Sequence, residues 1–349
     1  MTLEYIGLFR YQIALHPSLP VASQRIDQRQ GLVLHLATAT ASTSVEIAPL
    51  SGLDEQQQPL SGFSRETLAE VEEQLQQLLP TLLHQATDNL LDKVGGQYPS
   101  LDYGLSLAHA KLSGLLQPAR IAPESIGLFY GLPDESDADV QERLTQFLAH
   151  YSGHFLKIKV GHRPWPQDLA LIYQVLARRP HLRLRLDANQ QYSLADAIDF
   201  CASLPHGSID YIEEPCAHPI DSQTVYQATG IGFALDETLC QPNYHYQAYA
   251  GLSALVLKPM LIGDLARLQT MINSAAQDGV RCVLSSALES SLGIHDLIDL
   301  SAQLTPDDAP GVDTLRPFSH DLLVASAAKP CLTLADLTPV LTLGQRVTL

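Results

Sequence analysis

The middle of the chain repeats one pattern, in which a short apolar strand is followed by a polar turn and an amphipathic helix. The pattern extends from about residue 115 to about residue 315, with a period of very roughly 25 residues. Strands that alternate with helices predict a parallel sheet covered by helices, and eight of them can close a modified (β/α)8 barrel of the TIM type. The eight expected strands are residues 126–130, 155–160, 182–187, 209–213, 232–236, 254–258, 281–286 and 311–313.

The first hundred residues lack this repeat and have a mixed α+β pattern. The segment 48–62 is polar and rich in Gln, Gly and Pro, which is the composition of a mobile loop. We therefore expect an α+β capping domain over residues 1–105, a barrel over 106–322, and a tail, 323–349, that returns to the capping domain. The expected elements of the cap are strands at 3–15, 31–37 and 44–47, a helix at 65–85 capped by Ser64, and a helix at 102–115.

Composition limits the possible partners of the chain. Its 349 residues carry a formal net charge of −17, which argues against binding to nucleic acid or to an anionic membrane surface and favours small molecules. No apolar run approaches the length of a membrane span, and the N-terminus has no secretory pattern. The five cysteines are odd in number and form no C-x-x-C pair, so we expect a reducing compartment and a cytoplasmic location.

Ionisable side chains stand at the ends of five consecutive predicted strands, from the second to the sixth. In a parallel barrel the active site is built at the carboxyl ends of the strands, so these groups are expected to share one pocket. Lys157 and Lys159 are two apart on one strand and point inward together, and Lys258 faces them across the barrel. A single group of this kind is more often a helix cap or a surface charge, but five in succession predict a catalytic site.

Three carboxylates lie between the lysine positions, on three adjacent strands: Asp187, Glu213 and Asp236. Oxygen ligands of this type suit Mg²⁺. A cation bound there would stabilise the charge that forms when a proton is removed next to a carboxylate. A lysine that acts as the base must be partly neutral, and we expect the charge of Lys157 to lower the pKa of Lys159.

Two further features accompany these strand ends. Glu214 and Glu237 each follow a predicted ligand, and strand alternation points them away from the barrel interior, in a supporting role. Residues 290–293 follow the seventh strand and predict a turn and a helix start. The free backbone N–H groups of such a start would also suit a substrate carboxylate.

The strand-end motifs resemble those of the enolase superfamily, in its lysine–lysine branch. The matching text is Lys157-x-Lys159, LDAN at 186–189, IEEP at 212–215, Asp236-Glu237 and Lys258-Pro259. A finer likeness to the o-succinylbenzoate synthases of proteobacteria extends over about residues 30–315. It rests on EIAPL at 46–50, LRLDAN at 184–189, EEPC at 213–216 and the segments 285–293 and 304–314, while the 48–62 loop looks longer than in that family.

The resemblance implies a magnesium-dependent lyase, with manganese as a substitute. Its reaction would be the syn dehydration of 2-succinyl-6-hydroxy-2,4-cyclohexadiene-1-carboxylate to o-succinylbenzoate, a step toward menaquinone. Lys159 would take the ring proton and return it to the departing hydroxyl group. Lys258 would stabilise the intermediate from the other face, by a cation–π contact. Asp187, Glu213 and Asp236 would bind the metal.

The resemblance also implies supporting residues and a lid. Two loops of the cap, 15–30 and 48–62, would close over the succinyl tail of the substrate. The residues expected to contact the substrate or to support the site are Lys157, Arg185, Asn189, Ser285 and Gly311.

Three alternatives stay open. An N-acylamino acid racemase or dipeptide epimerase of the same superfamily would use both lysines from opposite faces, but those epimerases carry an acidic D-x-D on the eighth strand, where residues 310–313 hold one acid. A Schiff-base aldolase with Lys258 as nucleophile would leave the three carboxylates without a role. A non-catalytic protein on the same fold would be expected to lack a lysine, and none is missing.

Overall fold

A seven-stranded parallel sheet forms the barrel wall in the computed structural model, which describes residues 1–21, 24–60, 63–120, 124, 126–132, 135–242 and 244–345. Its strand order is β10-β9-β8-β7-β6-β5-β4, so every neighbour in the sheet is also a neighbour in the sequence. This confirms the predicted α/β barrel class. The strands are β4 (Gly127–Phe129), β5 (Phe155–Lys159), β6 (Arg183–Asp187), β7 (Ile209–Glu213), β8 (Phe233–Leu235), β9 (Leu252–Leu257) and β10 (Arg281–Leu284).

The eighth predicted strand, residues 311–313, is reduced to a single bridge, in which Gly311 pairs with Ser285. On the other side of this segment the carbonyl of Pro310 accepts a hydrogen bond of 3.0 Å from the N–H of Ile126, just before β4. Pro310 has no N–H to donate to a ladder, which limits a strand at this position. The ring therefore closes through a short seam rather than through a full strand.

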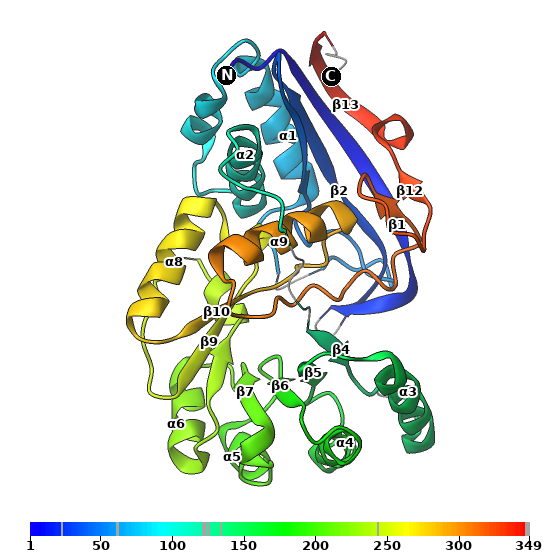
Figure 1. Cartoon of the computed structure of the whole chain (residues 1–349), viewed down its shortest axis with the longest axis vertical. Helices are drawn as coiled ribbons and strands as arrows, with labels where there is room; N and C mark the ends of the chain where they lie inside the picture. The colour runs from blue at the N-terminus through cyan, green and yellow to red at the C-terminus, as the bar shows by residue number, and fades with distance from the viewer. Residues whose placement is uncertain are drawn as a thin grey trace.

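Helices cover the outer face of the barrel (Figure 1). Their N-termini follow sequence signals: the side chain of Ser193, for example, accepts from the backbone N–H of Asp196. After β8 the described chain forms only a 3₁₀ turn, η4 (Glu237–Cys240), before it reaches β9. The helices are α3 (Asp137–His150), α4 (Trp165–Arg178), α5 (Leu194–Ala202), α6 (Pro219–Thr229), α7 (Pro259–Ile262), α8 (Leu265–Gln277) and α9 (Ser291–Leu304).

An antiparallel sheet of order β13-β1-β2-β3 forms the other half of the molecule, at the top of Figure 1. Its strands are β1 (Tyr5–Val21), β2 (Gln24–Ala37), β3 (Ser42–Ile47) and β13 (Thr338–Gly344). Because β13 pairs with β1, the tail lies on this sheet, although residues 346–349 fall outside the described residues. The tail also contains β11 (Asp321–Leu322), β12 (Cys331–Leu332) and η5 (Leu334–Asp336). The domain limits at residues 105 and 322 stay predictions.

Two helices pack on this sheet, with bounds that differ from the predicted ones. The first, α1 (Leu68–Leu78), begins after Thr67, which forms a capping box with Glu70. It passes into the turn η1 (Leu79–Thr81), which contains Pro80, so the expected range 65–85 was too long. After η2 (Thr87–Lys93) comes α2 (Pro99–Leu112), which starts at a proline, a favoured first residue.

The predicted 15–30 loop is a continuation of the β1–β2 hairpin, so the expectation of a loop there was wrong. Leu19 pairs with Ile26 and Pro20 with Arg25, after a register shift that begins at Ala14. Ile26 is buried, and this apolar contact keeps the two arms paired despite the prolines. Residues 22 and 23 lie outside the described part. In Figure 1 the hairpin extends from the top of the molecule down to β4.

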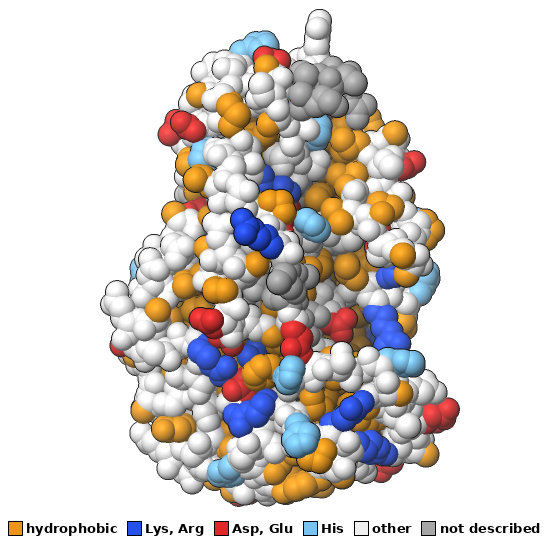
Figure 2. All heavy atoms as spheres, in the orientation of Figure 1, with side chains coloured by type: hydrophobic (Ala, Val, Ile, Leu, Met, Phe, Trp, Pro, Cys, Tyr) orange, Lys and Arg blue, Asp and Glu red, His pale blue; other side chains and the backbone are white. Residues whose placement is uncertain are grey.

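Charged side chains of both signs lie on the face that Figure 2 shows. Basic, acidic and histidine side chains intermix over its lower half, where Figure 1 places the barrel helices. Within the described residues no helix has the length and apolar character that a membrane crossing requires.

Candidate active site

A cavity of about 300 Å³ opens at the carboxyl ends of the barrel strands, beneath the N-terminal sheet. Pro20 and Val21 of the hairpin and Leu50 and Phe63 of the cap reach it, so both predicted lid segments contribute to its wall. Residues 61 and 62 of the second segment lie outside the described residues. The predicted site residues that line the cavity are Lys157, Lys159, Asp187, Asn189, Asp236, Lys258, Ser285 and Gly311.

Strand register brings the functional side chains into one layer. Lys159 of β5 pairs with Asp187 of β6, and Asp187 pairs with Glu213 of β7, so these three side chains stand in a row across the sheet. Asp236 follows directly after β8. The alternate residues of these strands, such as Ile158 of β5, are buried on the opposite face of the sheet, as strand alternation requires.

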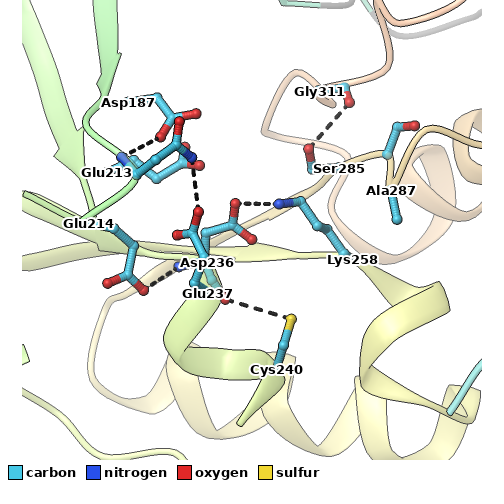
Figure 3. Close-up of polar contacts among 12 residues, drawn as sticks. Asp187, Glu213, Glu214, Asp236, Glu237, Cys240, Lys258, Ser285, Ala287 and Gly311 are labelled. Atoms are coloured by element: carbon cyan, nitrogen blue, oxygen red, sulfur yellow. Dashed lines mark hydrogen bonds and ion pairs between the residues drawn. The ribbon is translucent and has the colours of Figure 1, made fainter. Parts of the chain in front are cut away.

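Two of the three lysines, Lys157 and Lys258, form direct ion pairs with the carboxylates. The Nζ atom of Lys157 lies 2.9 Å from Oδ2 of Asp187 and 2.8 Å from Oε1 of Glu213. Lys258 pairs with Oδ2 of Asp236, and Figure 3 shows it reaching Asp236 from one side while Asp187 and Glu213 lie together on the other. The three carboxylate residues are only 1–2% exposed.

Burial and neighbouring charges both shift the pKa values in this cluster. Burial alone would lower the pKa of Lys157, but the charges of Asp187 and Glu213 outweigh it and hold that pKa well above its usual value. For Asp187, burial is outweighed by the nearby lysines, and the pKa falls to about 2. Burial and the charge of Asp187 raise the pKa of Glu213 well above its usual value. One ammonium group therefore does not satisfy both acids.

The donor set fits a hard divalent cation. Oδ1 of Asp236 is buried and has no hydrogen-bond partner among the described residues, and the same holds for Oε2 of Glu237. Buried carboxylate oxygens without partners are costly unless an ion or a donor satisfies them. A cation bound here would also add positive charge beside Asp187 and Glu213, which share the single ammonium group of Lys157.

The distances between the three acids, however, are set by their ion pairs with the lysines. Asp187, Glu213 and Asp236 do not offer oxygens that all lie within 4.8 Å of one another, because Lys157 stands between two of them and Lys258 holds the third. Among the described residues, a group with that spacing occurs on α9 instead, at His295, Asp296 and Asp299.

The two glutamates next to the predicted ligands behave differently from each other. Glu214 turns away from the cavity, as predicted, and accepts bonds of 2.9 Å from the backbone N–H groups of Asp236 and Thr238. Glu237 lines the cavity, so the prediction for it was wrong. The reason is that β8 ends at Leu235 and the chain turns into η4, where strand alternation no longer applies. Burial, followed by the charge of Asp236, raises the pKa of Glu237 to about 7.

Asn189 connects Lys159 to this group of acids. Its Oδ1 atom accepts a bond of 3.4 Å from Nζ of Lys159, and its Nδ2 atom donates to Oε1 of Glu237 at 2.9 Å. On the other side of the cavity the hydroxyl of Ser285 donates to the carbonyl of Gly311 at 3.3 Å. These residues therefore line the cavity, and their contact with a substrate stays a prediction.

Arg185 lies elsewhere, one layer deeper in the barrel. It does not line the cavity, and it is 1% exposed. Its guanidinium group donates to Oδ2 of Asp210 at 2.9 Å and to Oδ1 of Asp308 at 3.1 Å. Arg185 stands two residues before Asp187 on the same inward-facing row of β6. It therefore lies about 7 Å further from the strand end than Asp187. A contact with substrate would require these ion pairs to open.

The helix start at residues 290–293 is already capped by Glu46 of β3. The N–H groups of Ser290 and Gly293 each donate to its Oε2 atom, at 3.1 and 3.0 Å. The suggestion that a substrate carboxylate binds there was therefore wrong. Glu46 stands in the EIAPL segment, but a single acid at a strand end does not reveal in sequence which helix it will cap.

Two family models match the chain: "MenC, N-terminal domain" over residues 3–112 and "Enolase C-terminal domain-like" over residues 139–324. The second covers more than half of the chain, including every predicted metal ligand and both lysines predicted to be catalytic.

Curated relatives match along almost the whole length. The o-succinylbenzoate synthase of Haemophilus influenzae is 34% identical over 328 residues, which are 93% of this chain and 94% of the relative. That of Pectobacterium atrosepticum is 35% identical over 320 residues, or 90% and 91%. The solved o-succinylbenzoate synthase of Thermosynechococcus elongatus, with Mg in its active site, superposes with a TM-score of 0.70 at 24% identity, covering 95% of this chain and 97% of that one. This chain belongs to the o-succinylbenzoate synthase family of the enolase superfamily.

Proposed function

We propose that this chain catalyses the syn dehydration of 2-succinyl-6-hydroxy-2,4-cyclohexadiene-1-carboxylate to o-succinylbenzoate, a step in menaquinone biosynthesis. The observation that carries the proposal is a cavity with Lys159 and Lys258 in its wall and three buried carboxylates beside them, in a member of this family. The reaction makes the chain a carbon–oxygen lyase.

Magnesium is the proposed cofactor, with manganese as a substitute because it accepts the same oxygen ligands. When bound, the ion would stabilise the negative charge that develops on the substrate carboxylate. Asp187, Glu213 and Asp236 would hold it. Two observations support this assignment: one oxygen of Asp236 has no hydrogen-bond partner in the part of the chain that the structure describes, and two of the acids share Lys157.

Lys159 is the proposed base. Its Nζ atom would remove the ring proton next to the carboxylate. It would then donate that proton to the hydroxyl group on the neighbouring ring carbon, as the carbon–oxygen bond breaks and water leaves. In a syn elimination both groups depart from one face, so one lysine can serve both steps. Asn189, which binds both Lys159 and Glu237, would keep the amine in place.

Lys258 would stabilise the opposite face of the ring, by charge and by a cation–π contact. Lys157 would orient Asp187 and Glu213, which it already contacts. Apolar side chains on the cap and barrel would pack on the ring and exclude water, while Ser285 and the backbone of Gly311 would contact the polar tail. These apolar residues are Leu50, Phe63, Ile126, Leu128, Leu261 and Leu288.

An epimerase of the same superfamily is the second candidate. Asp313 lines the cavity and could pair with a substrate amine. Burial raises its pKa, which weakens such a pair, and the sequence supplies one acid there rather than two. Racemisation of N-acylamino acids or dipeptides would be the distinguishing activity.

One assay tests the proposal. Purified protein, Mg²⁺ and the cyclohexadiene acid are mixed, and the absorbance of the diene is followed while the product is identified by mass spectrometry. We expect the diene to disappear, and chelation of the metal to stop the reaction. Absence of turnover with either Mg²⁺ or Mn²⁺, together with racemisation of a dipeptide, would replace the dehydratase with the epimerase.

A small-molecule carboxylate is thus the proposed partner, with neither nucleic acid nor membrane, and the cytoplasm is the proposed location. All five cysteines are free thiols, which supports a reducing compartment. Fractionation of cells that produce the chain would test the location.

A further inference from the structure

Arg29 of β2 is a buried charge at the contact between the N-terminal sheet and the barrel. It is 2% exposed, and the groups that accept its hydrogen bonds are backbone carbonyls, while its charge also acts on the buried carboxylate of Glu289. Its Nε atom donates to the carbonyl of Leu288 at 2.9 Å, and Nη1 donates to the carbonyls of Gln30 and Pro49 at 2.9 and 3.0 Å. Nη2 donates to the carbonyl of Ala48 at 2.5 Å. One side chain thus joins the cap to a loop of the barrel.

The two segments that Arg29 joins are walls of the cavity. Leu50 lines it immediately after Ala48 and Pro49, and Ala287 and Leu288 line it from the barrel side. Leu288 has a φ of 65°, a left-handed conformation that a branched side chain rarely adopts and that its surroundings must hold. Its carbonyl is held by Arg29, and its N–H donates to the hydroxyl of Ser286 at 2.9 Å.

The chemistry of the side chain suits this task. A buried guanidinium group is tolerated only when its donors are satisfied, and here they point to carbonyls on separate segments. A lysine would offer its donors from a single nitrogen, which cannot reach all of these carbonyls at once. Burial of the cation therefore depends on both walls being in place.

We propose that Arg29 is a positioning residue for the reaction, which fixes the 48–50 segment of the cap against the 287–288 turn of the barrel and so shapes the substrate cavity. The inference rests on the proposed function for its kinetic consequence. Arg29 touches neither the lysines nor the carboxylates of the site, so its loss should weaken substrate binding more than it slows the chemistry.

Lys111 of α2 supplies a matched control. Its Nζ atom also links the sheet to a barrel helix, through the carbonyl of Ser44 at 2.9 Å and Oδ1 of Asp296 at 2.5 Å. Neither of these residues lines the cavity. A change in Lys111 therefore loosens the same contact between the two halves without touching the walls.

The kinetic test compares Arg29→Met, Arg29→Lys and Lys111→Met with the wild type. For Arg29→Met we expect KM to rise about tenfold and kcat to change by less than about threefold, with Arg29→Lys in between. Lys111→Met should leave KM within about twofold of the wild type. An equal rise of KM in Lys111→Met, or none in Arg29→Met, would overturn the inference.

A second measurement does not depend on the activity. Hydrogen exchange is followed by mass spectrometry in peptides that cover residues 46–53 and 284–292. We expect exchange in both to be faster by about tenfold in Arg29→Met and unchanged in Lys111→Met. Unchanged exchange in Arg29→Met would refute the positioning role even if the wild type is an active dehydratase. If that variant does not fold, Arg29→Lys is judged by the same criteria. If exchange is faster in Arg29→Met but the wild type does not dehydrate the substrate, the proposed function is rejected and the positioning role of Arg29 is kept.

Discussion

Two charge clusters lie at different depths of the barrel, and they are built differently. The upper cluster, at the carboxyl ends, contains the lysines and carboxylates of the cavity wall. The lower cluster contains Arg185, Arg281, Asp210 and Asp308, in which each acid contacts both arginines at 2.9–3.3 Å. A bulge at Asp210, where Leu184 pairs with Ile209 and Arg185 with Tyr211, lets its carboxylate enter the lower cluster.

The difference lies in how completely the charges are paired. In the lower cluster Arg185 also packs on aromatic rings, 4.5 Å from the centre of Phe155 and 5.2 Å from that of Tyr211. In the upper cluster Asp236 and Glu237 each keep a buried oxygen without a partner among the described residues. A cluster that satisfies its charges holds the barrel together, whereas one that leaves them unsatisfied loses stability and retains the capacity to bind a ligand.

The largest effect should come from the upper cluster. Lys159→Ala removes the proposed base, and we expect kcat to fall on the order of 10³-fold, within the usual range for loss of general acid–base catalysis. Folding should change little, because within the described residues Lys159 makes one hydrogen bond, which is long, at 3.4 Å to Asn189. Urea unfolding and steady-state rates are measured together, with Lys93→Ala on the exposed surface as the control. Near-normal turnover in Lys159→Ala would contradict its role.

The lower cluster should show the opposite response. Arg185→Met leaves two buried acids with one arginine between them, which should lower the free energy of unfolding by roughly 3–5 kcal/mol. We expect turnover per folded molecule to change little. Urea unfolding gives the first quantity and active-site-normalised rates the second. A raised KM with unchanged stability would instead support the substrate contact predicted from sequence for Arg185, and would break the comparison.

Metal affinity should separate the acids of the two clusters. Asp236→Asn removes a proposed ligand and should weaken Mg²⁺ binding by at least about 10–100-fold, the loss usual even for outer partners of a metal. Asp210→Asn, in the lower cluster, is the matched control and should leave Mg²⁺ affinity unchanged. Titration calorimetry measures both. Equal affinities in the two variants would remove Asp236 from the ligand set.

The smallest effect concerns Asp168 of α4, a carboxylate that belongs to neither cluster. It is buried and accepts a bond of 2.8 Å from the N–H of Gly161, but burial dominates and raises its pKa to about 6. A raised acid pKa means that the folded state binds the proton more tightly than the unfolded state. Stability relative to Asp168→Asn should therefore fall as the pH rises from about 4 to about 7, by less than about 3 kcal/mol. Urea unfolding at several pH values measures this difference, and parallel curves would contradict it.

Much of the barrel and of its upper cluster could be predicted from sequence, because both follow from local periodicity. Alternation along a strand is enough to point Lys157 and Lys159 to one side, and the carboxyl ends of parallel strands meet at one face. The order of Asp187, Glu213 and Asp236 along the chain then gives their order around the ring.

The features that sequence could not supply depend on long-range contacts or on where a strand ends. Glu46 caps a helix that lies 244 residues further along the chain. Glu237 faces the cavity because β8 stops one residue before Asp236. Strand alternation, which predicts that Asp187 faces the barrel interior, also predicts that Arg185 lies deeper in the barrel. Its contacts with Asp210 and Asp308 could not be predicted in this way, because they depend on a bulge and a loop.

The seam at Pro310 and Gly311 makes the barrel wall uneven in strength. Elsewhere adjacent strands share ladders, but here, within the described residues, the wall is joined on the β4 side by the bond from Ile126 to Pro310 and by the bond from the N–H of Leu128 to the carboxylate of Asp313. Local opening starts where the fewest hydrogen bonds must break. We therefore expect the barrel wall to open first at this seam. Because Ile126 and Gly311 both line the cavity, each such fluctuation widens the cavity from the side and leaves the row of Lys159, Asp187 and Glu213 undisturbed.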